Sequence, residues 1–455
     1  MKVLLIQPPK SPRTIGGEDV FIYEPLALEY LAAGVKEDHD IRILDMRLEK
    51  DLGQVLGEFG PDIVGITAYT VHVNVVWNLF EQIKRWNPST CTVVGGHHAT
   101  VMPMDFVSPF IDVIVTGEGV SPFKEIVKRL ERREKLDGIP GTAVTANGRL
   151  VSTPYEPDSD LDAFPFPDRT LTARYRGKYY SEWMKPLASI RTSKGCPYRC
   201  TFCAEWKIAG GHYLKRKPRR VVEELGEIGE EYVFFADDES LVDAPRMSEL
   251  ARRIKEAGIR KRYFLYGRSD TIARNPRLLD TWRDVGLERV FIGLEFFRDE
   301  DLAYVGKSST ASDNERAVRM LQDLGIDVYA SFIVRPDFSH ADFFSFRQYC
   351  RDLGLNYASF AVLTPLPGTD LYEEVRDQIV TRNYDDFDFI HTLLPTALPI
   401  KEFYREYRQL FMHAIPMRRQ ISQLKKYALR DIPGTILKGR RFYDRLATIH
   451  LEYGR

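Results

Sequence analysis

Short apolar runs alternate with helical segments along most of this chain, and this alternation limits the folds open to it. In the first block, apolar runs start near residues 2, 41, 62, 92 and 113, and stretches with helical spacing lie between them. Strands that alternate with helices form parallel sheets covered by helices on both faces. The sequence therefore predicts an α/β fold that opens with a doubly wound, Rossmann-like domain over residues 1–145.

A second block repeats the pattern from residue 186. Strands are expected at 189–192, 232–236, 263–267, 290–294, 327–334 and 357–363. Helices rich in Glu, Arg and Leu are expected at 218–230, 245–257, 275–285, 311–324 and 340–353. Six β/α units predict a partial (β/α)6 barrel of the TIM type over residues 186–400, with its chemistry at the carboxyl ends of the strands.

The segments outside the two blocks differ in composition. Residues 146–185 are rich in Pro, Asp, Arg and Tyr, which predicts an ordered linker. Residues 401–455 hold 13 Lys and Arg against 5 acids, and we expect a small, basic, helical C-terminal region. Such a segment suits peripheral contact with an anionic membrane, although a solvated helical cap with a positive face is the favoured interpretation.

The net charge, the apolar runs and the cysteine count limit the partners and the location of the protein. A net charge of −1 gives no reason to expect nucleic acid as a partner. No apolar run reaches the length of a membrane span. Five cysteines without a signal peptide predict a reducing, cytoplasmic location, membrane-peripheral if residues 401–455 bind lipid.

Three cysteines stand close together, Cys196, Cys200 and Cys203, with the spacing C-x3-C-x2-C. Three thiolates at this spacing can hold three irons of a [4Fe–4S] cluster and leave the fourth iron open to a ligand. A structural zinc site needs four N or S ligands, and only the lone His212 follows; zinc and plain buried thiols remain as alternatives. Cys91 and Cys350 lie in apolar segments and are expected to be core residues.

This motif, preceded by Gly195 and containing Phe202, resembles that of radical S-adenosylmethionine (SAM) enzymes. In that family the amino and carboxylate groups of SAM chelate the open iron, and reductive cleavage of SAM makes a 5′-deoxyadenosyl radical. The resemblance implies a [4Fe–4S] cluster on Cys196, Cys200 and Cys203, with Phe202 near SAM.

The first block resembles the cobalamin-binding domain that precedes many radical SAM domains. The likeness rests on Val93-Val94-Gly95-Gly96-His97-His98-Ala99-Thr100 followed by Gly117-Glu118-Gly119. It places cobalamin beyond the carboxyl ends of the strands, as doubly wound sheets place their ligands. The residues implied are Pro8, Thr67, Ala68, Tyr69, Thr70, Gly95, Gly96, His97, His98, Thr100, Thr116, Gly117, Glu118 and Gly119. A flavin or nucleotide in the same place, or a metal on the two adjacent histidines, is the alternative.

The motif Asp-x-His-x-x-Gly, whose His ligates cobalt in methionine-synthase-type domains, is missing, and Asp38-His39 has the wrong spacing. We therefore expect cobalamin to bind base-off. Residues after the third strand then face the lower side of the ring. His72 is a less favoured direct ligand than a capping or surface residue.

Several polar residues end barrel strands. By resemblance Asp237 and Asp238 form part of the barrel mouth, and Glu295 binds the amino group or ribose of SAM. Arg268 suits the SAM carboxylate, with an ion pair to Asp237 or Glu295 as the alternative. Lys307 is interpreted as polar support.

Other segments point to a subgroup. Arg335 replaces a glycine usual after the fifth strand, and a rigid turn is expected at 364–371. With residues 389–396 this pattern resembles the hopanoid C-3 methylase-like subgroup. His391 is interpreted as structural rather than as part of a substrate cavity.

The two modules together imply a cobalamin-dependent radical SAM methyltransferase. It would methylate an unactivated carbon of a small or lipid-like substrate, with a hopanoid as one candidate, through the deoxyadenosyl radical and methylcobalamin. An electron donor such as flavodoxin or ferredoxin is implied. The alternatives are a cobalamin-dependent radical SAM enzyme that performs a rearrangement, ring contraction or cyclisation, and a non-catalytic cobalamin or iron–sulfur sensor.

Overall fold

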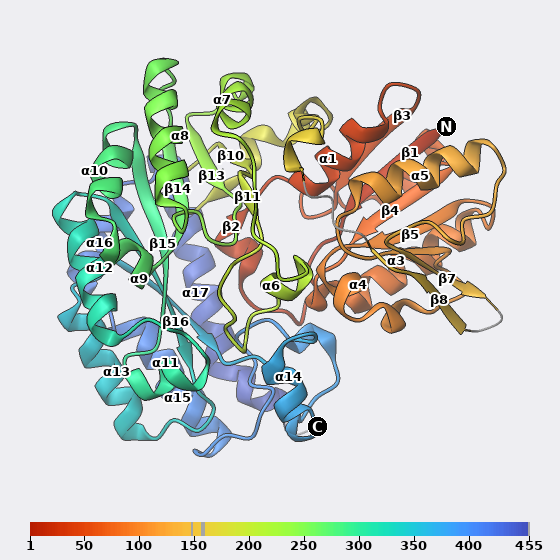
Figure 1. The fold of residues 1–455 in the computed structure, drawn as a ribbon. Helices are drawn as coiled ribbons and strands as arrows, with labels where there is room; N and C mark the ends of the chain where they lie inside the picture. The colour runs from red at the N-terminus through yellow and green to blue at the C-terminus, as the bar shows by residue number, and fades with distance from the viewer. Residues whose placement is uncertain (147–148, 156–159, 454–455) are drawn as a thin grey trace.

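The computed structural model describes residues 1–146, 149–155 and 160–453, which build two sheet-based halves side by side. The N-terminal half, red to orange in Figure 1, lies beside a larger half that runs from green to blue. The predicted α/β class is confirmed, because both halves are built on mostly parallel sheets covered by helices.

The first sheet has the strand order β3-β1-β4-β5-β6-β7-β8. Its strands are β1 (Lys2–Gln7), β3 (Asp40–Asp45), β4 (Ile63–Thr67), β5 (Cys91–Gly95), β6 (Val113–Val115), β7 (Thr142–Ala146) and β8 (Arg149–Thr153). The first five in this order are parallel, and β7 and β8 add an antiparallel hairpin. The sheet therefore continues to Thr153, past the expected boundary at 145, because the half-exposed β8 lacks the apolar run that marks a buried strand.

Helices cover both faces of this sheet, as a parallel sheet requires. Alternate residues of β1 point to opposite sides. Val3 and Leu5 pack against α1 (Leu26–Val35) and α5 (Val120–Glu131). Leu4 and Ile6 pack against the helices of the other face, α2 (Leu52–Phe59) and α3 (Val73–Trp86).

The second sheet is a six-stranded parallel barrel wall in the order β10-β13-β14-β15-β16-β17, which follows the sequence. Its strands are β10 (Leu187–Ile190), β13 (Tyr232–Phe235), β14 (Arg262–Arg268), β15 (Leu287–Glu295), β16 (Asp327–Val334) and β17 (Tyr357–Val362). All six predicted strands are present within a few residues of their expected bounds.

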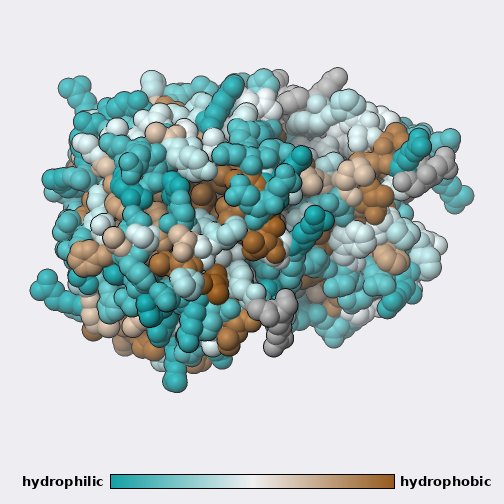
Figure 2. All heavy atoms as spheres, turned by 90° about the horizontal axis from the view of Figure 1, so that it is seen from below, coloured by the Kyte–Doolittle hydropathy of each residue, from teal (hydrophilic) through white to brown (hydrophobic). Residues whose placement is uncertain are grey.

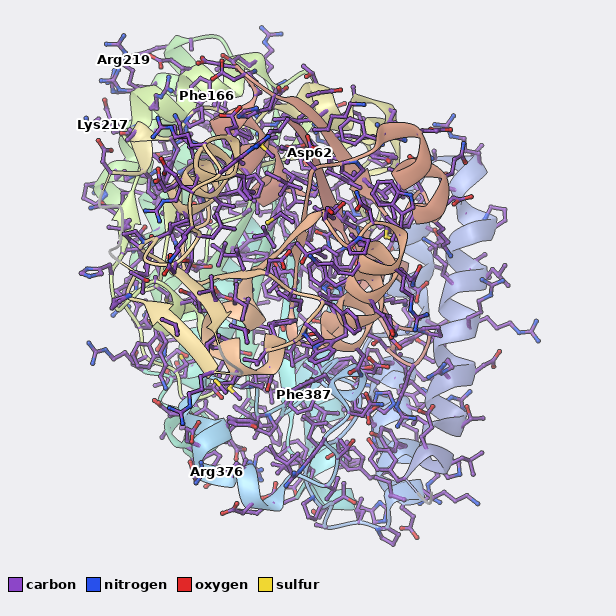
Figure 3. The ribbon with its side chains drawn as sticks, turned by 90° about the vertical axis from the view of Figure 1, so that its right-hand side faces the viewer. Asp62, Phe166, Lys217, Arg219, Arg376 and Phe387 are labelled. Atoms are coloured by element: carbon purple, nitrogen blue, oxygen red, sulfur yellow. The ribbon has the colours of Figure 1, made fainter. Side chains whose placement is uncertain are left out.

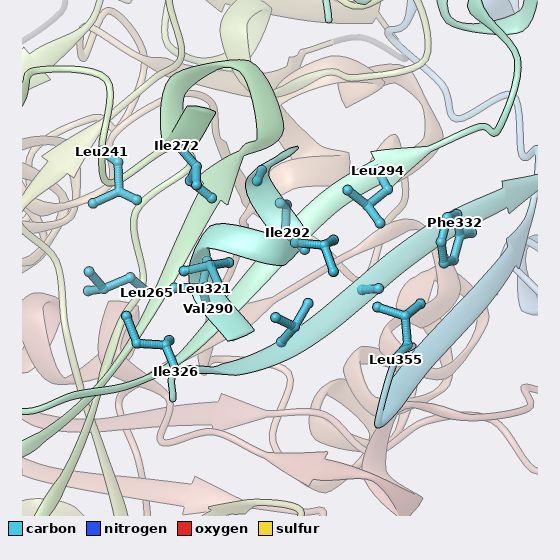
Figure 4. Close-up of a cluster of buried hydrophobic side chains, with 14 of the residues drawn as sticks. Leu241, Leu265, Ile272, Val290, Ile292, Leu294, Leu321, Ile326, Phe332 and Leu355 are labelled. Atoms are coloured by element: carbon cyan, nitrogen blue, oxygen red, sulfur yellow. The ribbon is translucent and has the colours of Figure 1, made fainter. Parts of the chain in front are cut away.

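The barrel helices lie outside this wall. The five predicted ones are α7 (Pro218–Glu227), α8 (Ala244–Glu256), α10 (Pro276–Asp284), α12 (Ala311–Asp323) and α13 (His340–Asp352). Val290, Ile292 and Leu294 of β15 join the core beneath these helices (Figure 4). Phe291, Gly293 and Glu295, the residues between them, therefore face the barrel lumen.

Four short helices were not predicted: α6 (Glu205–Ile208), α9 (Ser269–Arg274), α11 (Asp299–Tyr304) and α14 (Asp370–Val375). Each is too short to show a helical apolar period in the sequence. All four follow a barrel strand or lie in a loop near the barrel mouth, so they shape the candidate site.

The N-terminal chain leaves its own sheet after β1 and packs on the barrel. Ile15 belongs to the barrel core, and the ring of Tyr23 stacks on Phe234 with centroids 4.6 Å apart. Strand β2 (Phe21–Ile22) pairs with β9 (Tyr180–Ser181) in the linker. Residues 1–145 are therefore not wholly confined to the first domain.

The C-terminal region contains α15 (Ile400–His413), α16 (Met417–Leu424) and α17 (Ile432–Thr448). Phe403 and Tyr407 of α15 are buried in the barrel core, so this helix is part of the barrel rather than of a separate region. Helix α17 lies along the outer edge of the molecule, where its side chains project away from the ribbon (Figure 3).

The face of the molecule in Figure 2 is largely hydrophilic, with hydrophobic side chains gathered towards its middle. Within the described ranges, none of the helices has both the length and the apolar composition needed to cross a bilayer.

A buried network of charges joins the linker to both halves. Arg176 pairs with Glu24 of the N-terminal segment and with Glu230 of the barrel, at 2.6 Å for the second pair. Glu29 on α1 is fully buried and accepts a hydrogen bond from Thr172 of the linker. Burial, followed by repulsion from Glu24, raises the pKa of Glu29 well above its ordinary range.

Replacing Glu29 with Gln should therefore stabilise the protein increasingly as the pH rises. The unfolded chain releases the Glu29 proton in the ordinary glutamate range while the folded chain keeps it, so wild-type stability falls by up to about 1.4 kcal/mol per pH unit above that range. Thermal melts of Glu29→Gln and wild type across pH 5 to 8.5 measure this. The exposed Glu37→Gln serves as the control, and a pH-independent difference for Glu29→Gln would contradict the prediction.

Candidate active site

The cysteine-bearing loop, residues 195–213, follows β10 at the carboxyl end of the barrel sheet. It is closed at its base by β11 (Ser193–Lys194), which pairs antiparallel with β12 (Leu214–Lys215). Gly195 begins the loop with φ +83°, and a Cβ there would lie 2.0 Å from the carbonyl oxygen of His212. The turn therefore accepts only glycine.

Backbone contacts fix the loop against the rest of the barrel. The N–H of Thr201 donates to the carbonyl of Val305 at 2.9 Å, and the Thr201 carbonyl accepts from the N–H of Leu371 at 2.9 Å. Phe202 packs against an apolar cluster that includes Phe296 and Leu371. The expected turn at 364–371 thus helps to hold the cysteine loop.

The donor set fits a [4Fe–4S] cluster. Cys200 is buried, and Cys196 and Cys203 are partly buried. Burial raises the pKa of the Cys196 thiol to about 11; burial and then repulsion from Glu205 raise the pKa of Cys203, with smaller contributions from Cys200 and Cys196. Within the described ranges, no three His, Cys, Asp or Glu side chains converge as they would around one ion. A cluster does not require this, because each thiolate binds a different iron.

Asp237 and Asp238, the predicted barrel-mouth pair, position the start of this loop. Asp237 accepts hydrogen bonds from the backbone of Thr192 and Ser193 at 2.6 and 2.8 Å. Asp238 accepts from the N–H of Gly195 at 2.6 Å. Burial, and then repulsion from Glu205, raises the pKa of Asp238 to about 7.

Arg268 lies against the cluster ligands. Its Nη1 lies 3.6 Å from the sulfur of Cys200, its Nη2 donates to Ser308 at 3.2 Å, and its Nε donates to Asp270 at 2.9 Å. The guanidinium carbon lies 3.7 Å from the centroid of the Tyr198 ring. The expected alternative, an ion pair of Arg268 with Asp237 or Glu295, is wrong. Asp270, in the first turn of the helix after β14, is the acid within reach.

Glu295 ends β15 in a left-handed conformation, φ +59°, at an irregularity in the pairing with β16. Lys307 holds its carboxylate at 2.7 Å and also donates to the carbonyl of Gly293 at 2.6 Å. A Cβ at residue 293 would lie 2.4 Å from Oε1 of Glu295, so glycine there makes room for this carboxylate. Such strain in a non-glycine residue is typical of functional sites.

The lumen below this rim is aromatic and uncharged. The rings of Tyr266, Phe291 and Tyr329 follow one another with centroids 4.7 and 5.0 Å apart. Nearer the mouth the accessible lumen positions are small or hydroxylated: Gly293, Ser331, Ser359 and Ala361. Sequence reasoning missed these residues, although the two-residue period of each predicted strand identifies them once the lumen face is known.

The floor of the lumen is closed by a buried ion-pair group at the other end of the strands. Arg289 is fully buried, pairs with Glu182, and donates to Asp327 at 2.6 Å. Its guanidinium carbon lies 5.3 to 5.9 Å from four aromatic rings, those of Trp183, Phe264, Tyr329 and Tyr357. The lumen is therefore closed at the amino end of the strands.

Glycines shape the strand ends of the first domain. Gly96 has φ +100°, and a Cβ there would lie 2.8 Å from the backbone nitrogen of Ala68. Gly117 has φ +78°, and a Cβ would lie 2.7 Å from the ring of Tyr155. Thr100 joins the two loops by accepting from the N–H of Gly117 at 3.0 Å and donating to the Gly96 carbonyl at 2.9 Å.

The other residues implied in cobalamin binding lie at the same edge. Thr67, Thr70, Gly95, Thr116 and Gly119 are partly accessible, whereas Pro8 is buried and Ala68 is fully buried. His98 is also fully buried, with one ring nitrogen 3.1 Å from Thr70 and the other 2.9 Å from Asp105. The expectation that His98 faces the ligand is therefore wrong; helix α4 (His97–Val101) turns it into the core.

His72 and His391 have structural positions. His72 accepts a hydrogen bond from the backbone of Tyr69 and caps the turn that precedes α3, and burial lowers its pKa to about 4. His391 is buried and lies 2.9 Å from Asp388. Arg335, at the position of the missing glycine, pairs with Asp301 at 2.8 Å and with Asp337 at 2.6 Å.

The carboxyl ends of the two sheets face each other. Glu118, after β6, pairs with Arg191 at 3.0 Å and with Lys194 at 3.2 Å, both at the start of the cysteine loop. Burial opposes ionisation of Glu118, but the two cations outweigh it and lower its pKa to about 2. Gly368 of the 364–371 turn likewise touches Val101 of α4.

Three side chains line a space between the halves. The ring of Tyr69 meets that of His97 at 4.6 Å, and His97 lies 3.6 Å from Glu205 of the cysteine loop. Tyr69 is 49% exposed, yet burial raises its pKa to about 12, and burial raises the pKa of Glu205 to about 7. The desolvation indicates that Tyr69 and Glu205 lie among many protein atoms where the two halves meet.

Comparison with known proteins agrees with this geometry. The B12 binding domain family matches residues 12–127, and the Radical SAM superfamily matches residues 190–350. The hopanoid C-3 methylase of Methylococcus capsulatus is 33% identical over 89% of this chain and 78% of its own length. The chain belongs to the cobalamin-dependent radical SAM methylases.

A second sequence relative and a solved structure are also similar to the enzyme. An anaerobic magnesium-protoporphyrin IX monomethyl ester cyclase of Rubrivivax gelatinosus is 28% identical over 98% of this chain and 84% of its own length. The structure of the radical SAM methyltransferase TsrM from Kitasatospora setae, with tryptophan and a SAM analogue bound, superposes with a TM-score of 0.71. That match covers 99% of the enzyme and 98% of TsrM at 19% identity, and it bears on the fold alone. Family membership implies a [4Fe–4S] cluster, SAM and cobalamin as cofactors.

Replacing Gly195 with Ala should abolish cluster binding, because the new methyl group would collide with the His212 carbonyl. Gly211→Ala is a matched control: Gly211 has φ +77° in the same loop but no atom within 4 Å of a Cβ. It carries only the left-handed penalty of about 1 kcal/mol. Iron content and the visible absorption of reconstituted protein report the result. Equal iron in the two variants would contradict the prediction.

Replacing Arg268 with Gln should make the cluster harder to reduce. Removing a cation beside a thiolate ligand disfavours the more negative reduced state, and we expect at least a tenfold shift in the reduction equilibrium, which is 59 mV for a one-electron couple. Redox titration followed by electron paramagnetic resonance measures it. Arg268→Lys should show a smaller shift from the wild-type potential, because it keeps a cation. Arg274→Gln, at an exposed arginine that also pairs with Asp270, should show no shift. An unchanged potential in Arg268→Gln would contradict this role.

Proposed function

We propose that the enzyme methylates an unactivated carbon of an apolar, lipid-like small molecule, with a hopanoid as the first candidate. The observation that carries the proposal is the uncharged, aromatic lumen beneath a polar rim. A neutral hydrocarbon loses no hydration of its own in such a site and gains from burial of apolar surface. The likeness to the hopanoid C-3 methylase supports the same substrate class.

The cofactors supply the radical chemistry and the methyl group when they are bound, and the chain supplies position and exclusion of water. Cys196, Cys200 and Cys203 would hold the cluster. Phe202 and Glu295 would lie beside SAM, with Glu295 offering its carboxylate to an ammonium or hydroxyl group. Arg268 already has a partner for each guanidinium nitrogen, so we assign it to the cluster ligands first.

Cobalamin would lie in the space between the two halves, against the glycine-rich ends of β5 and β6. Base-off binding, without a protein histidine below the cobalt, is part of the proposal. His72 is engaged as a cap and both ring nitrogens of His98 have partners, which supports it. Tyr69 remains as the side chain that would face the ring, with His97 packed against it and 3.6 Å from Glu205.

The setting completes the proposal. The reaction needs a low-potential electron donor, for which a flavodoxin or ferredoxin is the natural class. We expect a cytoplasmic enzyme that takes no nucleic acid as partner and meets its substrate at a membrane surface.

A second candidate is a cobalamin-dependent radical SAM reaction without methylation, such as a cyclisation. The 28% identity to an anaerobic cyclase over most of the chain supports this second candidate. Both reactions use the same cofactors, so products alone separate them.

The deciding experiment uses anaerobic, cobalamin- and cluster-loaded enzyme with SAM, a low-potential reductant and a bacterial lipid extract. S-adenosylhomocysteine and 5′-deoxyadenosine are quantified together by mass spectrometry. Methylation predicts that the extract stimulates both in roughly equal amounts. Deoxyadenosine without matching S-adenosylhomocysteine would reject methylation and indicate the second candidate.

A pair of cysteine variants controls this assay. Cys196→Ala should abolish deoxyadenosine formation, because one iron of the cluster loses its ligand. Cys350→Ala, at a buried cysteine of α13 outside the site, should retain it. Failure of the wild-type enzyme to cleave SAM at all would indicate a sensor rather than an enzyme.

A further inference from the structure

Large apolar side chains are exposed along α16, α17 and the segment between them. Five of them retain about half or more of their surface: Met417 65%, Ile421 56%, Leu429 86%, Ile436 57% and Leu437 48%. Single exposed apolar residues are ordinary on a protein surface, but a series of them along one segment calls for an explanation.

Cations are interleaved with these apolar side chains. Residues 417–441 contain eight Lys and Arg and a single acid, Asp431. Three of the eight have internal partners: Arg419 at the carbonyl of Gly354, Lys426 at Asp327, and Lys438 at the hydroxyl of Tyr180.

The other five cations are exposed: Arg418, Lys425, Arg430, Arg440 and Arg441. Arg440 lies 3.9 Å from Asp444, and both side chains are at least 70% exposed, so this pair is weak. Within the described ranges no ion pair is formed by Arg418, Lys425, Arg430 or Arg441. The net charge of this surface is therefore left for an external partner to balance.

The face of α17 is one-sided. Ile436, Leu437, Arg440 and Arg441 follow the three- and four-residue spacing that places them together on the exposed side. Leu446 near the end of the helix is buried in the barrel core. Figure 3 shows this helix at the outer edge of the molecule, where a flat partner can reach it.

We propose that this C-terminal basic face, formed by the five apolar and five cationic side chains named above, docks on an anionic lipid bilayer. Apolar side chains enter the interface while Lys and Arg stay at the level of the headgroups, which is the pattern of helices that lie in the membrane plane. Each cation near an anionic surface adds to binding, and the effect weakens with salt. The docking face rests on the membrane setting proposed above, but its test does not depend on the reaction.

The test is co-flotation of the full-length, cofactor-loaded enzyme with vesicles. We expect binding to vesicles that contain phosphatidylglycerol, weaker binding to pure phosphatidylcholine, and release at high salt. Ile436→Glu/Leu437→Glu and Arg440→Gln/Arg441→Gln should each lower the partition coefficient at least tenfold. Methylation need not be measured, so failure of one proposal leaves the other standing.

Phe344→Glu is the matched control, because Phe344 on α13 is 61% exposed and lies outside the C-terminal basic face. It should bind vesicles like wild type, and circular dichroism melts should show that all variants are folded. Wild-type protein that stays off phosphatidylglycerol vesicles would overturn the proposal. The proposal would also be overturned if the α17 variants bound vesicles as tightly as wild type, or if they changed only the self-association of the protein.

Discussion

The ion pairs of Glu118 with Arg191 and Lys194 join the end of β6 to the start of the cysteine loop, and the candidate site depends on this junction. Parallel sheets bind ligands at the carboxyl ends of their strands. A reaction that uses one cofactor from each domain therefore needs those two edges turned towards each other. The buried carboxylate remains ionised, with a pKa near 2, because two cations share it.

The surroundings of this junction are short of compensating charge. Asp238 and Glu205 are both desolvated, and each has a pKa near 7. Lys194 is already engaged by Glu118. Carboxyl groups whose pKa is raised in this way by desolvation are found at functional sites, and also in structural charge networks. Asp238 and Glu205 lie between the cysteine loop and the strand ends of the first domain, which agrees with the cofactor site proposed above.

The polar rim and the aromatic lumen of the barrel have different roles. Asp237 and Asp238 accept hydrogen bonds from backbone N–H groups at the start of the cysteine loop, including that of Gly195. The barrel therefore orders this loop, rather than a metal alone. The lumen below it offers aromatic faces, which bind apolar surface without selecting a polar group. Arg289 is isolated beneath the aromatic rings with Glu182 and Asp327, so its charge is satisfied at the floor.

Much of this could be predicted from the sequence. The two-residue and helical periods predicted the barrel strands and their long helices, because those elements bury continuous apolar faces. The cysteine spacing and the glycines after β5 and β6 identified the site, since their chemistry and conformational freedom are properties of single residues. The hairpin β7–β8 and the short helices at the barrel mouth escaped prediction because they carry too few buried residues to show a period.

The sequence by itself determined which side chains are candidates for the site: three clustered thiols, glycines where the backbone turns to positive φ, and acids at strand ends. Only the tertiary structure decided which of them face the site. It turned His98 into the core, paired Arg268 with Asp270 and placed its guanidinium beside Cys200, and brought Tyr23 onto Phe234. The physical reason is that orientation and burial are set by packing between residues far apart in the chain, and the local pattern holds no record of those partners.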